Sequence, residues 1–322
     1  MTTIVNQHIR AVTCAALFIG APVIIGVAFV FVFAMPTVPA QSIQCTHPVQ
    51  PVRYLGVFEP DAPNSYVGVD QFAHGIGRQP NLVTYYSHWF VPFQVNFATA
   101  AARHGAITLV QIAPRDISLA SITSGRYDDY LRSYAAAVKK FGAQVILSFG
   151  HEMNGNWYSW GYQHSTPAEF VDAWRHIVTI FRKQGTRNVT WLWTVNIVNP
   201  QNNHIPDPAP WWPGSSYVNW VGIDGYYYYP SWTFASLFGP TITKVRELTR
   251  DPILIAETGA ASSTDQPAKI ADLFAGVRAY GLLGFVWFNQ DGVTKTQDWR
   301  ISDPSAYAAF CRAAMGYTRH LS

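Results

Sequence analysis

The sequence predicts an α/β fold of the (β/α)8 or TIM barrel type, in which eight parallel strands close into a cylinder surrounded by helices. Short apolar runs alternate with longer segments of helical pattern from residue 53 to the end of the chain. Eight such runs in about 270 residues match this barrel in strand number and length. An open doubly wound sheet is the alternative, but no glycine-rich phosphate turn follows the first run.

Each predicted strand is a short apolar run of the kind found in strands that are buried on both faces. In chain order the predicted strands are Arg53–Phe58, Leu82–Ser87, Ala106–Ile112, Gln144–Phe149, Val189–Val195, Trp220–Ile223, Ile253–Ala256 and Gly284–Phe288.

Helical patterns fill the intervals between the strands. Pro167 and Pro267 each stand where a first helical turn tolerates proline. The longest irregular stretch, Asn199–Ser216, follows the fifth strand, and we expect it to form part of a cleft wall. The clearest helical segments are Tyr127–Phe141, Pro167–Gln184, Phe234–Leu248 and Pro267–Tyr280.

The N-terminal segment differs from the rest of the chain. No charged residue occurs from Ala11 to Ala34, and a helix of that length, ~36 Å, would cross a hydrocarbon core of ~30 Å. Arg10 before the run favours a cytoplasmic N-terminus and an exported remainder. We favour an uncleaved signal anchor, while Val38-Pro39-Ala40 leaves a cleaved signal peptide open.

This pattern divides the chain into three parts. Residues 1–35 are the signal anchor or signal peptide, 36–52 a Pro-rich linker, and 53–322 a single catalytic domain. The catalytic domain is therefore expected outside the cytoplasm, either membrane-anchored or secreted, and we expect a monomer. Cys45 and Cys311 could form a disulfide there or remain two free thiols.

The amino-acid composition favours some classes of ligand over others. Charged residues are only 13%, against ~25% in typical soluble proteins, whereas aromatic residues reach 15% with 12 Trp. Flat rings stack on the apolar faces of sugars, although most of these aromatic residues are expected in the core. The net charge of +3 includes no basic block, so nothing indicates a nucleic-acid partner. The cysteine spacing does not resemble a zinc site, and we expect no cofactor.

Two glutamates stand at the carboxyl ends of predicted strands. Glu152 follows the fourth strand and Glu257 ends the seventh. Barrel enzymes carry their catalytic residues at this end of the strands, so both side chains should reach the same rim. Retaining glycosidases need two carboxyl groups ~5–5.5 Å apart, one as nucleophile and one as acid/base. The pair therefore predicts a sugar-cleaving enzyme.

Residues 151–161, HEMNGNWYSWG, closely resemble the acid/base segment of glycoside hydrolase family 26, the β-mannanase family. The resemblance implies a retaining barrel glycosidase with Glu152 as acid/base and Glu257 as nucleophile. It covers most of residues 53–315 in the same order. Its other segments are Trp191–Asn196, Val221–Tyr226, Ile255–Gly259 and Val286–Asn289.

The resemblance also implies roles for three aromatic residues. Tyr226 would donate a hydrogen bond to Glu257, or else simply line a loop of tyrosines. Trp287, at the end of the eighth strand, would lie under the sugar being cleaved, and Trp157 would lie beside it.

Three polar residues complete the candidate substrate-binding set. His151, directly before the acid/base, would orient Glu152 or contact the sugar, unless it is a core histidine. His88 stands at the end of the second strand, from which it could reach the same sugar. Asn196, at the end of the fifth strand, would contact a sugar hydroxyl, or else cap a loop.

These observations predict an endo-acting retaining hydrolase of β-1,4-mannan. The same chemistry on mixed-linkage glucan, β-1,3-xylan or a cell-envelope glycan is the first alternative. A non-catalytic glycan-binding barrel is the second, but a binder needs neither Glu152 nor Glu257.

Overall fold

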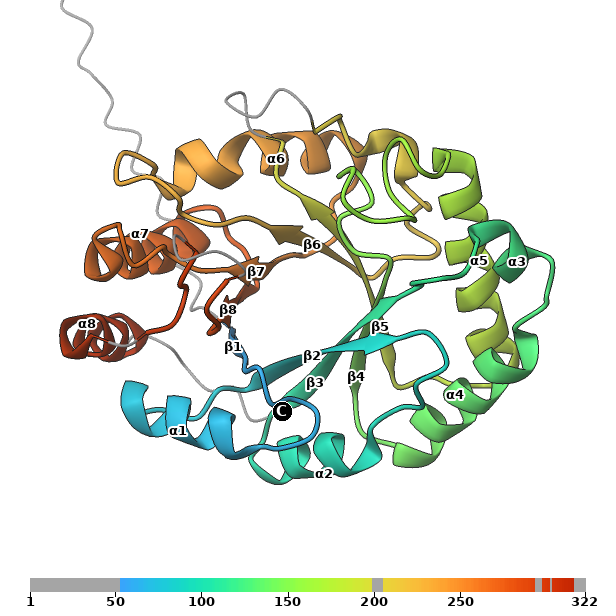
Figure 1. The fold of residues 1–322 in the computed structure, drawn as a ribbon, viewed down its shortest axis with the longest axis horizontal. Coiled ribbons are helices and arrows are strands. Elements are labelled where there is room, and N and C mark those ends of the chain that lie inside the picture. Colours follow the sequence, from blue (N-terminus) through green and yellow to red (C-terminus); the bar gives the residue numbers. More distant parts are fainter. Residues whose placement is uncertain (1–52, 199–204, 293–296, 302, 316–322) are drawn as a thin grey trace, which may run out of the picture. The chain divides into compact units, whose positions relative to one another are not determined.

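The computed structural model describes residues 53–198, 205–292, 297–301 and 303–315. Eight parallel strands form a closed barrel in sequence order, and β1 pairs with β8 to complete it (Figure 1). The strands are β1 (Tyr54–Phe58), β2 (Leu82–His88), β3 (Ile107–Ala113), β4 (Val145–Phe149), β5 (Val189–Asn196), β6 (Trp220–Asp224), β7 (Ile253–Thr258) and β8 (Gly284–Phe288).

Helices surround the barrel on the outside, as Figure 1 shows. They are α1 (Val67–Ile76), α2 (Val95–Arg103), α3 (Leu119–Thr123), α4 (Asp128–Phe141), α5 (Pro167–Lys183), α6 (Phe234–Leu248), α7 (Gln266–Ala279) and α8 (Pro304–Ala314), with a 3-10 turn, η1, at Ala209–Trp211. The predicted (β/α)8 fold is confirmed. Every predicted strand exists, with ends displaced by two residues at most.

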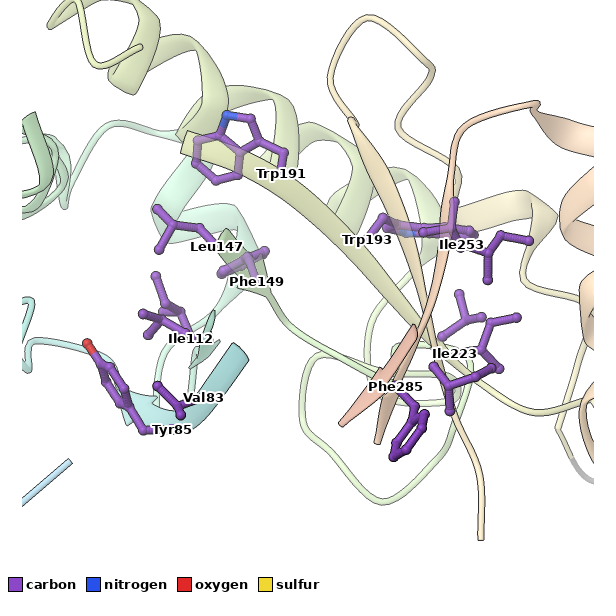
Figure 2. Packing of buried hydrophobic residues seen from close by; sticks show 14 of the residues in the cluster. Val83, Tyr85, Ile112, Leu147, Phe149, Trp191, Trp193, Ile223, Ile253 and Phe285 are labelled. Carbon is purple, nitrogen blue, oxygen red and sulfur yellow. The ribbon is translucent and has the colours of Figure 1, made fainter. Parts of the chain in front are cut away.

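The barrel has two apolar layers because successive strand residues point to opposite faces. On β2, Leu82 points into the barrel and packs with Leu109 and Ile146, residues of an inner cluster. Val83 and Tyr85 point outward into the larger cluster between strands and helices. Figure 2 shows members of this outer cluster, with labelled residues on every strand from β2 to β8. The inner layer closes the barrel beneath the carboxyl ends of the strands, where the site lies.

Local signals explain where the helices begin. Thr166 caps α5, accepting a hydrogen bond from the backbone of Glu169, whose side chain accepts one from the Thr166 backbone. Pro167 follows in the first turn, as predicted. The Asp265 side chain caps α7 by accepting a hydrogen bond from the backbone N–H of Ala268, and Pro267 stands in the first turn. Each cap satisfies backbone N–H groups that have no partner within the helix.

Several predictions fall on residues outside the described ranges. The N-terminal anchor or signal peptide (1–35), the linker (36–52), Cys45 and residues 199–204 all lie there. Cys311 has an exposed, free thiol, so the disulfide stays a prediction. None of the helices in the described ranges is both long and apolar enough to cross a membrane.

Candidate active site

A cleft of about 1030 Å³ opens at the carboxyl ends of the strands. Glu152 and Glu257 both line it, together with Asn196, Tyr226 and Trp157. Five of the eight predicted site residues therefore meet in one place. The cleft is as large as the biggest typical small-molecule pockets, ~300–1,000 Å³, and so has room for more than one sugar ring.

The backbone turns sharply between β4 and Glu152. Gly150 has a φ of 56° and Glu152 a φ of 55°, both in the left-handed region. A side chain at Gly150 would collide with Phe170 and Trp160, so glycine is required there. Glu152 itself is strained, since only glycine adopts this region freely. Its backbone N–H donates to the Thr194 carbonyl on β5 at 2.9 Å, which holds the strained turn in place.

Glu257 lies near the end of β7, one residue beyond the range predicted for that strand. Its backbone pairs with Asp224 of β6, and the register shifts on both sides of β7 at this point. A bulge of this kind re-aims a side chain relative to its strand. The irregularity therefore helps to direct the Glu257 carboxyl into the cleft.

The two glutamates face each other at short range. One carboxyl oxygen of Glu152 and one of Glu257 lie within 4.8 Å of each other. Retaining glycosidases hold this pair ~5–5.5 Å apart, whereas inverting enzymes need ~6.5–9.5 Å to admit a water. The spacing suits direct attack by one carboxylate on a sugar carbon while the other handles the proton.

Donors from two different strand ends fix the Glu152 carboxyl. The amide of Asn196 donates to Oε1 at 2.5 Å, and the indole N–H of Trp157 donates to Oε2 at 2.8 Å. Asn196 is held in turn by Asn154, which bonds both its backbone N–H and its carbonyl. Both predicted cleft residues therefore contact the glutamate itself.

Two tyrosine hydroxyls fix the Glu257 carboxyl. Tyr226 donates to Oε2 at 2.8 Å, the contact that the resemblance implied. Tyr86 donates to Oε1 through a short hydrogen bond. Tyr86 ends up here because it faces the barrel interior near the carboxyl end of β2, beside Phe58. It was not among the predicted site residues, although the alternation of β2 would have put it on the inward face.

Burial shapes the titration of the pair. Burial raises the pKa of Glu152, against the hydrogen bonds from Asn196 and Trp157. Burial and the neighbouring Glu152 raise the pKa of Glu257 to about 8, against its two tyrosine donors. Like charges this close disfavour a second ionisation, so the pair holds one proton at neutral pH. Phenols are the stronger donors, which favours the charge on Glu257 and the proton on Glu152.

Asp224, at the end of β6, is a third carboxyl that the sequence analysis did not select. It is fully buried, with an oxygen within 4.8 Å of both glutamates. Neither of its side-chain oxygens has a hydrogen-bond partner in the described part of the chain. Burial, followed by the charges of Glu257 and Glu152, raises its pKa well above the ordinary value. Burial beside two other carboxyl groups therefore disfavours a negative charge on Asp224.

These three carboxyl groups are close enough together to ligate one cation. However, both oxygens of each glutamate already accept a hydrogen bond from a neutral donor. Neutral donors at every glutamate oxygen suit acid/base and nucleophilic work better than metal binding.

His151 supports the cleft from behind. It is only 3% exposed, and its Nε2 lies 3.2 Å from the hydroxyl of Tyr158, which does line the cleft. The His151 ring also packs against Tyr86. Burial and the charge of Arg115 lower the pKa of His151 to about 3, so the ring is neutral. It positions Tyr158 and does not itself line the cleft.

The structure does not place Trp287 under the cleft. Its ring is fully buried outside the barrel, against Phe310 of α8, and its N–H donates to the carbonyl of Trp299 at 3.0 Å. Phe288, one residue later on β8, faces inward and lines the cleft instead. The expectation was wrong because neighbouring strand residues point to opposite faces. His88 is likewise exposed and does not line the cleft.

Comparison with known proteins agrees with this geometry. The model of Glycosyl hydrolase family 26 matches residues 93–268, more than half of the chain. The chain belongs to glycosyl hydrolase family 26. The match includes both glutamates and Asn196, and it confirms the resemblance seen in residues 151–161.

Two relatives of this family 26 chain carry different names. It is 32% identical over 257 residues to Endoglucanase H of Acetivibrio thermocellus, covering 74% of the chain and 28% of the relative. It is 25% identical over 112 residues to Mannan endo-1,4-beta-mannosidase A and B of Caldalkalibacillus mannanilyticus, covering 32% and 21%. The chain thus spans less than a third of these relatives' lengths.

A solved structure shares the fold of the family 26 chain. A GH26 β-mannanase from Bacteroides ovatus superposes with a TM-score of 0.61 at 16% identity, covering 82% of this chain and 86% of the other. At 16% identity, the similarity is evidence for a shared fold only.

Proposed function

We propose that the protein is a retaining β-glycoside hydrolase in which Glu257 is the nucleophile and Glu152 the acid/base. The observation that carries the proposal is the distance between the two carboxyl groups, within 4.8 Å, at the mouth of a family 26 barrel. This distance supports a covalent mechanism, because it leaves no room for a water between the carboxylate and the sugar.

In the first step, an oxygen of Glu257 forms a bond to the anomeric carbon as the glycosidic bond breaks. Glu152 transfers its proton to the departing sugar oxygen, so the leaving group departs as a neutral alcohol. The two tyrosine donors hold the attacking carboxylate at a constant angle. The product of this step is a glycosyl ester of Glu257.

In the second step, water hydrolyses that ester. Esterification removes the negative charge of Glu257. Because that charge disfavours ionisation of the neighbouring Glu152 carboxyl, its loss allows Glu152 to remain ionised. Glu152 then takes a proton from water while the water oxygen bonds to the anomeric carbon and the ester bond breaks. Two displacements return the original configuration, with Glu152 protonated and Glu257 ionised.

We propose β-1,4-mannan, cut internally, as the substrate. Support comes from family membership and from the mannan-cleaving names of two of the relatives above. Mixed-linkage or β-1,4-glucan is the second candidate, because the protein with the highest sequence identity among these three, 32%, is named an endoglucanase. β-1,3-xylan and cell-envelope glycans keep the same chemistry with a different polymer.

We also propose that the catalytic domain works outside the cytoplasm, attached to the membrane through residues 1–35 or released from it, and acts as a monomer. Support for export comes from the uncharged run from Ala11 to Ala34, preceded by Arg10. Its partners are then the membrane and a β-linked polysaccharide.

Purified full-length protein should be incubated with mannan, mixed-linkage glucan, β-1,3-xylan and envelope glycan, and the products sized. Internal cutting of mannan releases a range of oligosaccharides from the start of the reaction. Proton NMR of the first product should show the β-anomer before mutarotation. Glu257→Ala should abolish turnover but preserve oligosaccharide binding. Binding by wild type without turnover on any of the polymers would instead identify a glycan-binding barrel.

A further inference from the structure

A chain of aromatic rings runs from the nucleophile along one wall of the cleft. Tyr226, which bonds Glu257, packs against Trp299 with ring centroids 4.6 Å apart. Trp299 packs against Tyr228 at 5.0 Å, Tyr228 against Trp232 at 6.2 Å, and Trp232 against Tyr229 at 4.9 Å. All five side chains line the cleft. The catalytic steps above use only the first of them.

The outer rings of this chain are exposed. Tyr228 is 39% exposed and Tyr229 is 58% exposed, so their faces are not consumed by packing in the core. Single exposed aromatic side chains are ordinary, but a contiguous group of them within a cleft marks a binding surface. The amides of Gln290 and Gln297 line the same cleft. Flat apolar rings beside neutral amides match the alternating apolar faces and hydroxyls of pyranose sugars.

The loop that carries these rings is tied down from beneath. Lys269 of α7 is only 8% exposed, and its ammonium group donates to the carbonyls of Pro230 at 2.6 Å and Trp232 at 2.5 Å. The same ammonium group lies 5.8 Å from the ring centre of Tyr227. Asp272, also on α7, accepts a hydrogen bond from the Tyr227 hydroxyl at 3.2 Å.

Burying the Lys269 ammonium group costs desolvation free energy, which its hydrogen bonds to the two loop carbonyls must offset. Because breaking these bonds would leave a buried charge without acceptors, they hold the loop in one position. A platform held in place before the ligand arrives loses less entropy on binding. The exposed rings are therefore preorganised, which is the property expected of a binding subsite and not of a mobile surface loop.

We propose that Tyr228, Tyr229 and Trp232 form a subsite that stacks a pyranose unit of a linear β-linked chain, beyond the unit being cleaved. The inference rests on the proposed function and extends it to the length of the substrate. A chain long enough to reach the platform gains binding free energy that a shorter one cannot, so the enzyme favours polymers and long oligosaccharides over disaccharide-sized substrates.

The test compares long and short substrates with the full-length protein. Tyr229→Ala and Trp232→Ala each remove a ring, and Trp232→Phe restores one. A ring that covers ~50 Å² of apolar sugar surface contributes roughly a tenfold change in affinity. Each alanine variant should therefore raise KM for the polymer and for hexasaccharide about tenfold, with kcat little changed. Trp232→Phe should recover most of the loss.

Cleavage of an activated aryl glycoside of one sugar unit should be the same in all these variants, because that substrate does not reach the platform. Phe90→Ala is the matched control, since Phe90 is 57% exposed like Tyr229 but does not line the cleft. This variant should alter neither KM for the hexasaccharide nor cleavage of the aryl glycoside.

Lys269→Met tests the anchoring, because it keeps the apolar stem but removes both hydrogen bonds to the loop. It should raise KM for the hexasaccharide and leave cleavage of the aryl glycoside unchanged. Unchanged KM for the hexasaccharide in Tyr229→Ala and Trp232→Ala would overturn the subsite while leaving the proposed hydrolysis intact. Failure of the wild type on every glycoside would instead overturn the proposed function.

Discussion

Asn154 holds the backbone of Asn196 with both of its side-chain polar atoms. Its amide donates to the Asn196 carbonyl at 2.9 Å, and its carbonyl oxygen accepts from the Asn196 backbone N–H at 2.8 Å. The side chain of Asn196 in turn bonds Glu152. A residue two positions after Glu152 thus clamps the end of β5, which carries the donor to that same Glu152.

Asn154→Ala should therefore lower kcat, because the Asn196 amide loses the support that aims it at Glu152. A misplacement of this kind costs on the order of tenfold to a hundredfold in rate, with a smaller effect on KM. Steady-state kinetics on the polymer measure the two separately. The neighbouring exposed Asn156→Ala serves as the control and should behave as wild type. An Asn154→Ala variant with normal kcat would show that Asn196 needs no such support.

Glu152→Gln should alter the pH profile in a specific way. Activity of the wild type falls at high pH when Glu152 loses its proton, and at low pH when Glu257 gains one. Glutamine imitates the protonated Glu152, so it keeps Glu257 in its working environment but has no proton to lose. On an aryl glycoside with a good leaving group, formation of the glycosyl enzyme should keep its acidic limb and lose its basic limb. A basic limb that survives in this variant would assign that ionisation to another group.

Removing either tyrosine donor from Glu257 should shift the acidic limb upward. The hydroxyls of Tyr86 and Tyr226 lower the pKa of Glu257 against the effect of burial. In Tyr86→Phe or Tyr226→Phe that pKa rises, so the carboxylate is neutralised at a higher pH and activity is lost earlier on acidification. The pH dependence of kcat/KM measures the shift. Tyr85→Phe, on the outward face of the same strand, should leave the limb in place.

Glu59 makes stability depend on pH without taking part in the proposed chemistry. It is buried after β1, accepts a hydrogen bond from Asn289 at 2.8 Å, and burial raises its pKa to about 7 from an ordinary value of 4.5. Because the folded-state pKa is raised, the stabilising effect of the neutral form is complete below pH 4.5. It is lost as the pH rises through 7.

Glu59→Gln should remove that loss, because the glutamine can still accept the bond from Asn289 but never ionises. We expect the variant to gain roughly 1–3 kcal/mol relative to wild type at pH 8, and little at pH 4.5. Urea unfolding of both proteins at the two pH values measures the difference. The same difference at both pH values would mean that Glu59 does not ionise across this range.

The pairing of Glu152 with Glu257 could be predicted, because each glutamate stands at the carboxyl end of a predicted strand. Strands of a barrel end on one rim, so a glutamate at the end of β4 and another at the end of β7 must share it. Asn196 was predicted from its place at the end of β5, and Tyr226 and Trp157 from the family resemblance. The inward face of each strand was harder to assign. The resemblance implied Trp287, whereas its neighbour Phe288 lines the cleft, because a strand that is buried on both faces is apolar throughout and does not show which residues point inward. On β2, Tyr86 lines the cleft and His88 does not, although both stand at alternate positions from Leu82.

Tertiary packing decided the state of the carboxyl groups. Nothing in the residues around Asp224 indicates that it lies fully buried beside Glu257, because that environment comes from three different strands. The raised pKa values of the site have the same origin, since burial depends on the whole barrel. The aromatic platform likewise depends on Lys269, which lies 37 residues after Trp232.

By itself, the sequence determined the barrel, the family and the two acidic residues, because periodicity, strand count and short motifs can be recognised within short stretches of the chain. Only the tertiary structure decided which neighbouring side chains enter the cleft, which donors hold each carboxyl, and how far apart the carboxyls lie. Those features depend on strand facing and register across the closed sheet, where a shift of one residue turns a side chain from the cleft to the helices.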